Sequence, residues 1–344
     1  MKQVTRIVGM MCLSALLAVG FISCKKNDKA TTSSFTFSLP EVDGFVEDDG
    51  KAYIDFASSN YPMKWWEGDA LKIYSVDATN TTPTVVTYDM EEGGSGKVTA
   101  NFSGDEIEKG SYGYFAFYPA TKFVSVSEGN YGTFTVGATQ TFDPDMSFAG
   151  TSVAGRVFMD PQCAVAASTC DILNGGMVSA AMKHIFGFAN VRLKDMSGAT
   201  SGKKVAKVEI IDNTVNLTGK MTINIPEITS TRLDALKTLG NNYSTSNIGY
   251  ESYMASLNST LHDMGYSTEP DGKTVALVNC AAAGDAAKLT SSNKLFIISL
   301  RPGALLRGFT VKVTFDDNTY RTFDFNDVKY IIRPGTFSNI QCTF

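Results

Sequence analysis

The sequence predicts an all-β fold: two β-sandwich domains in tandem, with a short helical insertion in the second. Apolar and polar residues alternate through many segments, as in Phe309–Phe315, and this period of two is typical of strands with one buried face. The chain has 344 residues, of which 43% are hydrophobic, so it can build more than one core. The same alternation runs through both halves, and each half has room for one sandwich.

The composition argues against a nucleic-acid partner. Charged residues make up 19% of the chain, and the formal net charge is −5. A slightly acidic chain offers no electrostatic attraction to phosphate backbones. We therefore expect partners of another kind.

Residues 1–24 are a targeting segment and lie outside the fold. A basic start precedes the uncharged run Ile7–Ile22, which is shorter than the roughly 20 residues that a membrane-spanning helix needs. The run ends at Ser23 and Cys24, an order that resembles a bacterial lipobox, in which the cysteine is acylated and becomes the new N-terminus. The alternative is an ordinary signal peptide that happens to contain a cysteine. The lipobox predicts a lipoprotein with palmitate or similar chains on Cys24, held durably in the cell outer membrane because each buried methylene contributes about 0.8 kcal/mol.

The mature chain is expected to consist of a tether and two domains. Residues 25–34 are polar and poor in hydrophobic side chains, which is typical of a flexible tether. The N-terminal sandwich is expected over residues 35–175 and the C-terminal sandwich over residues 176–344. The boundary is placed there because an Asn-Gly-Gly turn at 174–176 precedes a fresh apolar stretch.

Alternation places the strands along both domains. In the first domain they are expected at Phe35–Leu39, Tyr53–Phe56, Leu71–Ile73, Val98–Phe102 and Ser111–Tyr118. In the second they are expected at Val208–Ile210, Met221–Ile225, Val275–Val278, Leu295–Leu300, Phe309–Phe315 and Ile340–Phe344. The helical insertion is predicted from the apolar spacing of Thr231–Leu239 and Tyr250–Met264.

The cysteines suggest one disulfide and no metal. After Cys24 four remain, an even number in an oxidising compartment: Cys163, Cys170, Cys280 and Cys342. Cys163 and Cys170 are close in sequence and could form a disulfide. No Cys-x-x-Cys or Cys/His spacing points to a metal ligand set.

No pattern in the chain points to catalysis. The two histidines, His184 and His262, have no nucleophile or carboxylate at motif spacing, so they are interpreted as a core residue and a surface residue. Paired carboxylates such as Asp316-Asp317 coincide with turn signals, where aspartate caps the backbone. We expect neither an enzyme nor a cofactor.

Trp65-Trp66 allows two interpretations. Exposed aromatic rings stack on sugars, which would suit a glycan-binding surface. The following Gly68 and the strand at Leu71–Ile73 favour instead a turn with Trp66 packed in the core, while Trp65 stays open between core and surface.

Six short motifs resemble those of the Bacteroidales fimbrillins, the subunits of type V pili. In order they are Trp66–Tyr74, Tyr114–Pro119, Asp145–Ala149, Lys183–Phe188, Leu217–Gly219 and Arg333–Phe337. The motifs follow the family order to the end of the chain. The resemblance implies two transthyretin-like Greek-key sandwiches, a place in a surface fimbrium with a role in cell adhesion, and other fimbrial subunits as partners. It also implies assembly by β-strand exchange, in which a protease cuts after an arginine, the first strand leaves, and another subunit's strand fills the groove.

The chain departs from that pattern in two ways. After Arg6 the next arginine is Arg156, so Lys51 is the candidate processing site in its place. The last strand, Ile340–Phe344, runs to the end of the chain and leaves no spare donor. Both departures suit an uncut anchor or accessory subunit of a pilus. The alternative function is a surface glycan-binding lipoprotein, which would use Trp65 and the Tyr-rich strands as a platform for a glycan or host ligand.

Overall fold

A computed structural model gives the structure of the chain. It describes residues 33–38, 64–77, 80–105, 112–118, 120, 123–127, 131–142, 157–159, 165–167, 178–212, 217–224, 231–232, 235–236, 250–263, 267–268, 272–305, 308–326 and 330–344. The candidate lipidation, processing and disulfide residues lie outside this set: Cys24, Lys51, Cys163 and Cys170. The strand predicted at Tyr53–Phe56 and the motif Asp145–Ala149 lie outside it as well. Their predicted roles stay predictions.

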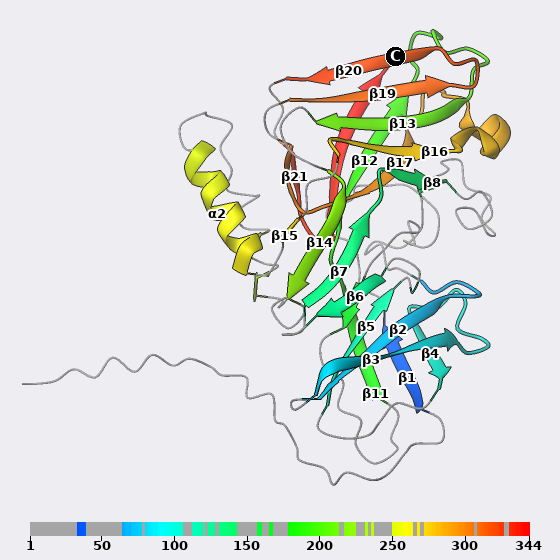
Figure 1. Ribbon diagram of the computed structural model, residues 1–344. Coiled ribbons are helices and arrows are strands. Elements are labelled where there is room, and N and C mark those ends of the chain that lie inside the picture. Colours follow the sequence, from blue (N-terminus) through cyan, green and yellow to red (C-terminus); the bar gives the residue numbers. More distant parts are fainter. Residues whose placement is uncertain are drawn as a thin grey trace, which may run out of the picture.

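The all-β prediction is confirmed, since strands dominate the described residues (Figure 1). The first group closes into a barrel with the order β1-β11-β10-β5-β2-β3-β4. Its strands are β1 (Ser33–Ser38), β2 (Ala70–Asp77), β3 (Asn80–Met90), β4 (Thr99–Gly104), β5 (Tyr112–Tyr118), β10 (Val165–Ala167) and β11 (Val178–His184). Strand β1 completes the closure because it pairs antiparallel with β4 and parallel with β11.

The second group forms two sheets that share one core. One sheet has the order β22-β12-β17-β9 and the other β20-β19-β13-β16-β8. Their bounds are β22 (Phe337–Thr343), β12 (Gly187–Lys194), β17 (Lys294–Leu300), β9 (Val157–Met159), β20 (Tyr320–Phe325), β19 (Phe309–Phe315), β13 (Val205–Asp212), β16 (Thr274–Val278) and β8 (Thr139–Thr141). Val191 and Ile298 of the first sheet pack in one cluster with Val208 and Val311 of the second. Strand β19 alternates buried and half-buried residues throughout, as its sequence predicts.

Two smaller sheets complete the strand pairing. One has the order β15-β14-β7-β6 and lies between the barrel and the sandwich in Figure 1; the other pairs β18 with β21. Their bounds are β6 (Phe123–Ser127), β7 (Tyr131–Val136), β14 (Gly219–Asn224), β15 (Ser267–Thr268), β18 (Gly303–Leu305) and β21 (Tyr330–Ile332).

Strand pairing crosses the domain boundary predicted at residues 175 and 176. Strands β7, β8 and β9 precede it and pair with β14, β16 and β17, which follow it. Strand β11 follows it and pairs in the barrel with β1 and β10. Strands from each side of the predicted boundary therefore pair within the same sheets. The division into the two domains 35–175 and 176–344 stays a prediction.

The helical insertion is confirmed by helix α2 (Tyr250–Asp263), and residues 231–232 and 235–236 are helical as well. Leu257 and Leu261 form the buried side of α2. A 3₁₀ helix, η2 (Cys280–Ala287), is a further element that strand alternation could not reveal. Among the described residues, no helix combines the length and hydrophobicity needed to cross a bilayer.

Candidate functional site: strand β1 and the loop that holds it

Strand β1 is bonded along both of its edges. All six of its residues have partners in β4, from Ser33 opposite Gly104 to Ser38 opposite Thr99. Four of them, Phe35 to Ser38, also have partners in β11. Neither neighbour is adjacent to β1 in sequence, so the strand lies between two segments that the chain reaches only later.

The side chains of β1 follow the predicted alternation. Phe35 and Phe37 are each 1% exposed and point into the barrel. The Phe35 ring meets Tyr88 edge-on at 5.1 Å, and the Phe37 ring meets Phe102 edge-on at 5.9 Å. On the other face Thr36 donates a 2.8 Å hydrogen bond to Asn101. Burying a phenylalanine is worth about 1.5–3 kcal/mol, so these two rings add a substantial hydrophobic contribution to the hydrogen bonds on both edges of the strand.

Trp65 is the buried tryptophan of the pair, and the prediction that Trp66 is the core residue is wrong. Trp65 is 0% exposed, whereas Trp66 is half-buried. The reason lies in the backbone: the Trp65 amide donates to the Lys97 carbonyl at 2.8 Å, and the Gly96 amide donates to the Trp65 carbonyl at 2.8 Å. This pairing turns residue 65 toward the core and its neighbour away from it. Trp65 is therefore not an exposed platform for a sugar.

The indole of Trp65 reaches β1. Its N–H donates to the backbone carbonyl of Phe37 at 3.1 Å. Its ring stands edge-on to Phe102 at 4.7 Å and to Tyr118 at 5.2 Å. The loop and the strand are thus joined by a polar bond inside an aromatic cluster.

The side chain of Asp69 accepts hydrogen bonds that link this loop to β5. One carboxylate oxygen accepts a 2.6 Å hydrogen bond from the Trp66 amide, and the other accepts a 2.8 Å bond from the Tyr118 hydroxyl. Gly68 makes this turn possible because its φ of 85° lies in the left-handed region that glycine adopts readily. Burial outweighs the two donors and raises the pKa of Asp69 to about 6.

The C-terminal strand β22 is used in the protein's own sandwich. It runs parallel to β12, from Phe188 opposite Phe337 to Lys194 opposite Thr343. Ile340 and Cys342 are buried in the core. The arrangement agrees with the prediction that this segment is needed for the protein's own last strand.

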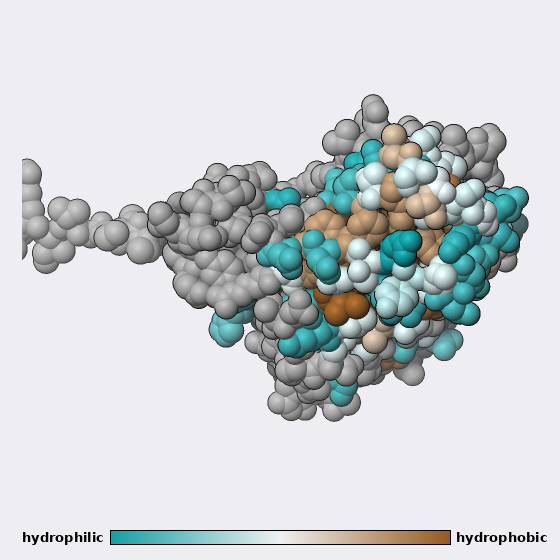
Figure 2. Space-filling view, turned by 90° about the horizontal axis from the view of Figure 1, so that it is seen from above, coloured by the Kyte–Doolittle hydropathy of each residue, from teal (hydrophilic) through white to brown (hydrophobic). Residues whose placement is uncertain are grey.

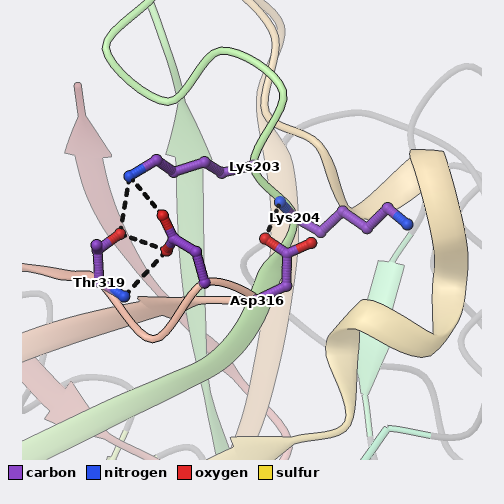
Figure 3. Close-up of polar contacts among 5 residues, drawn as sticks. Lys203, Lys204, Asp316 and Thr319 are labelled. Carbon is purple, nitrogen blue, oxygen red and sulfur yellow. Dashed lines mark hydrogen bonds and ion pairs between the residues drawn. The ribbon is translucent and has the colours of Figure 1, made fainter.

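The hairpin formed by β19 and β20 is held by polar contacts at its turn (Figure 3). Lys203 binds the carboxylate of Asp317 at 2.9 Å and donates to the Thr319 hydroxyl at 2.9 Å. Asp317 also accepts a bond from the Thr319 amide, and the Lys204 amide donates to Asp316 at 3.0 Å. The carboxylates of Asp316 and Asp317 cap a turn, as the sequence predicts, and both accept hydrogen bonds there.

The surface at the edge strand β20 combines apolar and hydrophilic residues. Figure 2 looks down on the side of β20 and shows apolar residues in the middle of the face with hydrophilic ones around them. The aromatic residues Phe323, Phe325 and Phe344 pack against the sandwich core and are only partly buried. Arg321 and Asp324 are exposed on β20, and charges on an edge strand discourage unspecific pairing with other strands.

One of the two histidines is buried and the other is exposed, and both described cysteines are buried. His184 is buried, and its burial lowers its pKa to about 3, while His262 is exposed on α2. Both agree with the interpretation made from the sequence. Cys280 and Cys342 are buried free thiols. Within the described part of the chain, no group of three or more His, Cys, Asp and Glu side chains could hold a metal ion.

Comparisons with known proteins find likenesses among solved structures. No family model and no curated protein matches the chain. A "putative cell adhesion protein" from Bacteroides ovatus is 13% identical, with 92% of this chain and 93% of that chain covered and a TM-score of 0.47. One from Bacteroides uniformis is 12% identical, with 91% and 95% covered and a TM-score of 0.45. The tip fimbrial protein Mfa3 from Porphyromonas gingivalis is 10% identical, with 86% and 81% covered and a TM-score of 0.32. Because every one of these TM-scores is below 0.5, we argue the function from the chain's own strands.

Proposed function

We propose that the chain is a structural subunit of surface fimbriae, an anchor or accessory subunit held to the outer membrane by lipid on Cys24. The observation that carries the proposal is the position of β1, which is bonded along both edges and buries Phe35 and Phe37. Removing such a strand leaves a groove lined with backbone donors, acceptors and aromatic pockets. A strand from another subunit can fill that groove by β-strand addition.

The same geometry supports a subunit that keeps its first strand. An attached strand competes with any incoming one at high effective concentration, so an uncut chain leaves its groove closed. Strand β22 is paired with β12 and holds Ile340 in the core, so donating it would open the protein's own sandwich. A lipid-held subunit with both strands in place suits the fixed end of a fibre.

The glycan-binding alternative loses the exposed tryptophan on which it partly depended. Trp65 is fully buried, and Tyr118, which belongs to the aromatic strand β5, is 6% exposed. Neither ring can stack on a sugar in this fold. The proposal also assigns no catalytic step and no cofactor to the chain.

The proposal is tested in the cells that make the protein. If it anchors fimbriae, Cys24→Ala should leave fibres assembled but released into the medium, because the lipid is the link to the membrane. Deleting the whole chain should have the same effect, and restoring the unmutated chain should reverse it. Fimbriae that stay attached in normal amount after both changes would overturn the anchoring role.

A further inference from the structure

The hydrogen bond from Trp65 falls near the end of strand β1. Its acceptor is the carbonyl of Phe37, the last residue but one of the strand. The bond comes from outside β4 and β11, the two strands that flank β1. It therefore ties the C-terminal end of the strand to a separate loop.

Trp65 is itself held too firmly to follow a departing strand. Two backbone hydrogen bonds join it to Gly96 and Lys97 in the turn before β4. Its ring is packed against Phe102 and Tyr118, and Tyr118 is in turn bonded to Asp69. The donor stays in place when its acceptor moves.

This arrangement makes the first step of strand loss unfavourable. A strand bonded on both edges peels from an end, and water replaces each exposed backbone bond as it breaks. The indole N–H of Trp65 is buried, so loss of the Phe37 carbonyl leaves it without an acceptor, which costs more than a bond exchanged for water. If β1 separates from its C-terminal end, this cost arises at Phe37, the second residue to leave.

We propose that Trp65 is a latch that keeps the C-terminal end of β1 in the barrel and so sets how fast this strand can open. The inference rests on the proposed function in one respect: in a strand-exchanging subunit, the rate of opening controls whether a partner's strand can enter. Trp65 acts as a positioning residue for β1, through the hydrogen bond from its indole N–H to the Phe37 carbonyl.

The test is amide hydrogen exchange, followed by mass spectrometry on the mature chain. The variant replaces Trp65 with its benzothiophene analogue, which keeps the shape of the ring and lacks the N–H. Trp65→Phe serves as a second, genetically encoded variant. The matched control is the same analogue at Trp66, which is half-buried beside the latch. Strand β19, with β20, provides an internal reference in the sandwich.

The latch predicts faster exchange in residues 33–38, by about twofold to tenfold, which is the rate equivalent of one net hydrogen bond. Strands β2 and β3 should be unchanged, and the Trp66 analogue should have no effect on β1. Equal acceleration in all barrel strands would show that Trp65 is only part of the core, and unchanged exchange in β1 would show that there is no latch. Either result overturns the inference. No partner subunit is present in this experiment, so its failure leaves the fimbrial function standing, whereas failure of the Cys24→Ala test leaves the latch standing.

Discussion

The Tyr118 hydroxyl donates a 2.8 Å hydrogen bond to the buried carboxylate of Asp69. The bond links β5 to the loop that carries Trp65. Asp69 is 8% exposed, and desolvation raises its pKa from 3.8 to about 6, although Trp66 and Tyr118 both donate to it. A loop that touches β1 is thus built around a carboxylate that is costly to ionise.

We predict that Asp69 makes the barrel more stable in mild acid. Because its folded pKa is raised, its contribution is fully present below pH 3.8 and is lost as the pH rises through about 6. The rise corresponds to about 3 kcal/mol between these limits. Asp69→Asn should remove this slope from denaturant unfolding curves measured between pH 4 and pH 7. An unchanged slope in the variant would contradict the assignment.

His184 is predicted to act in the opposite direction. Burial lowers its pKa from 6.5 to about 3, so its contribution is present above pH 6.5 and is lost as the pH falls toward 3. Between pH 6.5 and pH 5 the loss should be about 2 kcal/mol. His184→Phe should abolish this loss, because phenylalanine cannot be protonated, and its ring can keep the edge-on contact that His184 makes with Phe188 at 5.4 Å. If the variant loses as much stability at pH 5 as the natural chain, protonation of His184 is not the cause.

Gly104 is predicted to be essential for the packing of β4 in the barrel. A Cβ at this position would stand 2.5 Å from the Thr87 carbonyl oxygen and 2.9 Å from the Tyr88 ring. Gly104→Ala should therefore cost about 1–3 kcal/mol of unfolding free energy. Ser103→Ala, one residue earlier in the same strand, is the control and should cost much less. Equal effects of the two changes would argue against the predicted close contact.

Cys280 and Cys342 should be inert in the folded protein. Both are buried in the sandwich core, and burial raises the pKa of Cys342 to about 12 and that of Cys280 further. Since the thiolate is the reactive form, iodoacetamide should label neither before unfolding and both after it. Rapid labelling of either residue in the native state, measured by peptide mass spectrometry, would show that the sandwich opens locally.

The sequence predicted what depends on local pattern. Alternation placed Phe35 and Phe37 on the buried face of a strand, and the turn signal at Asp316-Asp317 marked a capped hairpin. The assignment of the core tryptophan failed, because a shift of one residue moves a side chain to the other face and nothing near Trp65 reveals the partner at Lys97.

The pairing of distant strands was beyond sequence reasoning. Strand β1 lies beside β11, and β8 and β9 join sheets made of later strands, so the sheets do not follow chain order. The choice among such partners depends on how side chains pack across the whole core. For that reason the alternation found the strand at Phe35–Leu39, but the bonding of its two edges and the hydrogen bond from Trp65 came only from the structure.

The central claim is that this subunit keeps β1 in its own barrel, and the N-terminus of the protein isolated from outer membranes tests it most directly. We predict a single mature form that begins at lipidated Cys24 and still contains residues 33–38, detected by intact mass and by its N-terminal peptide. A form that begins at Ala52, after cleavage at Lys51, would have lost the strand. That result would contradict the account and make the protein a processed stalk subunit.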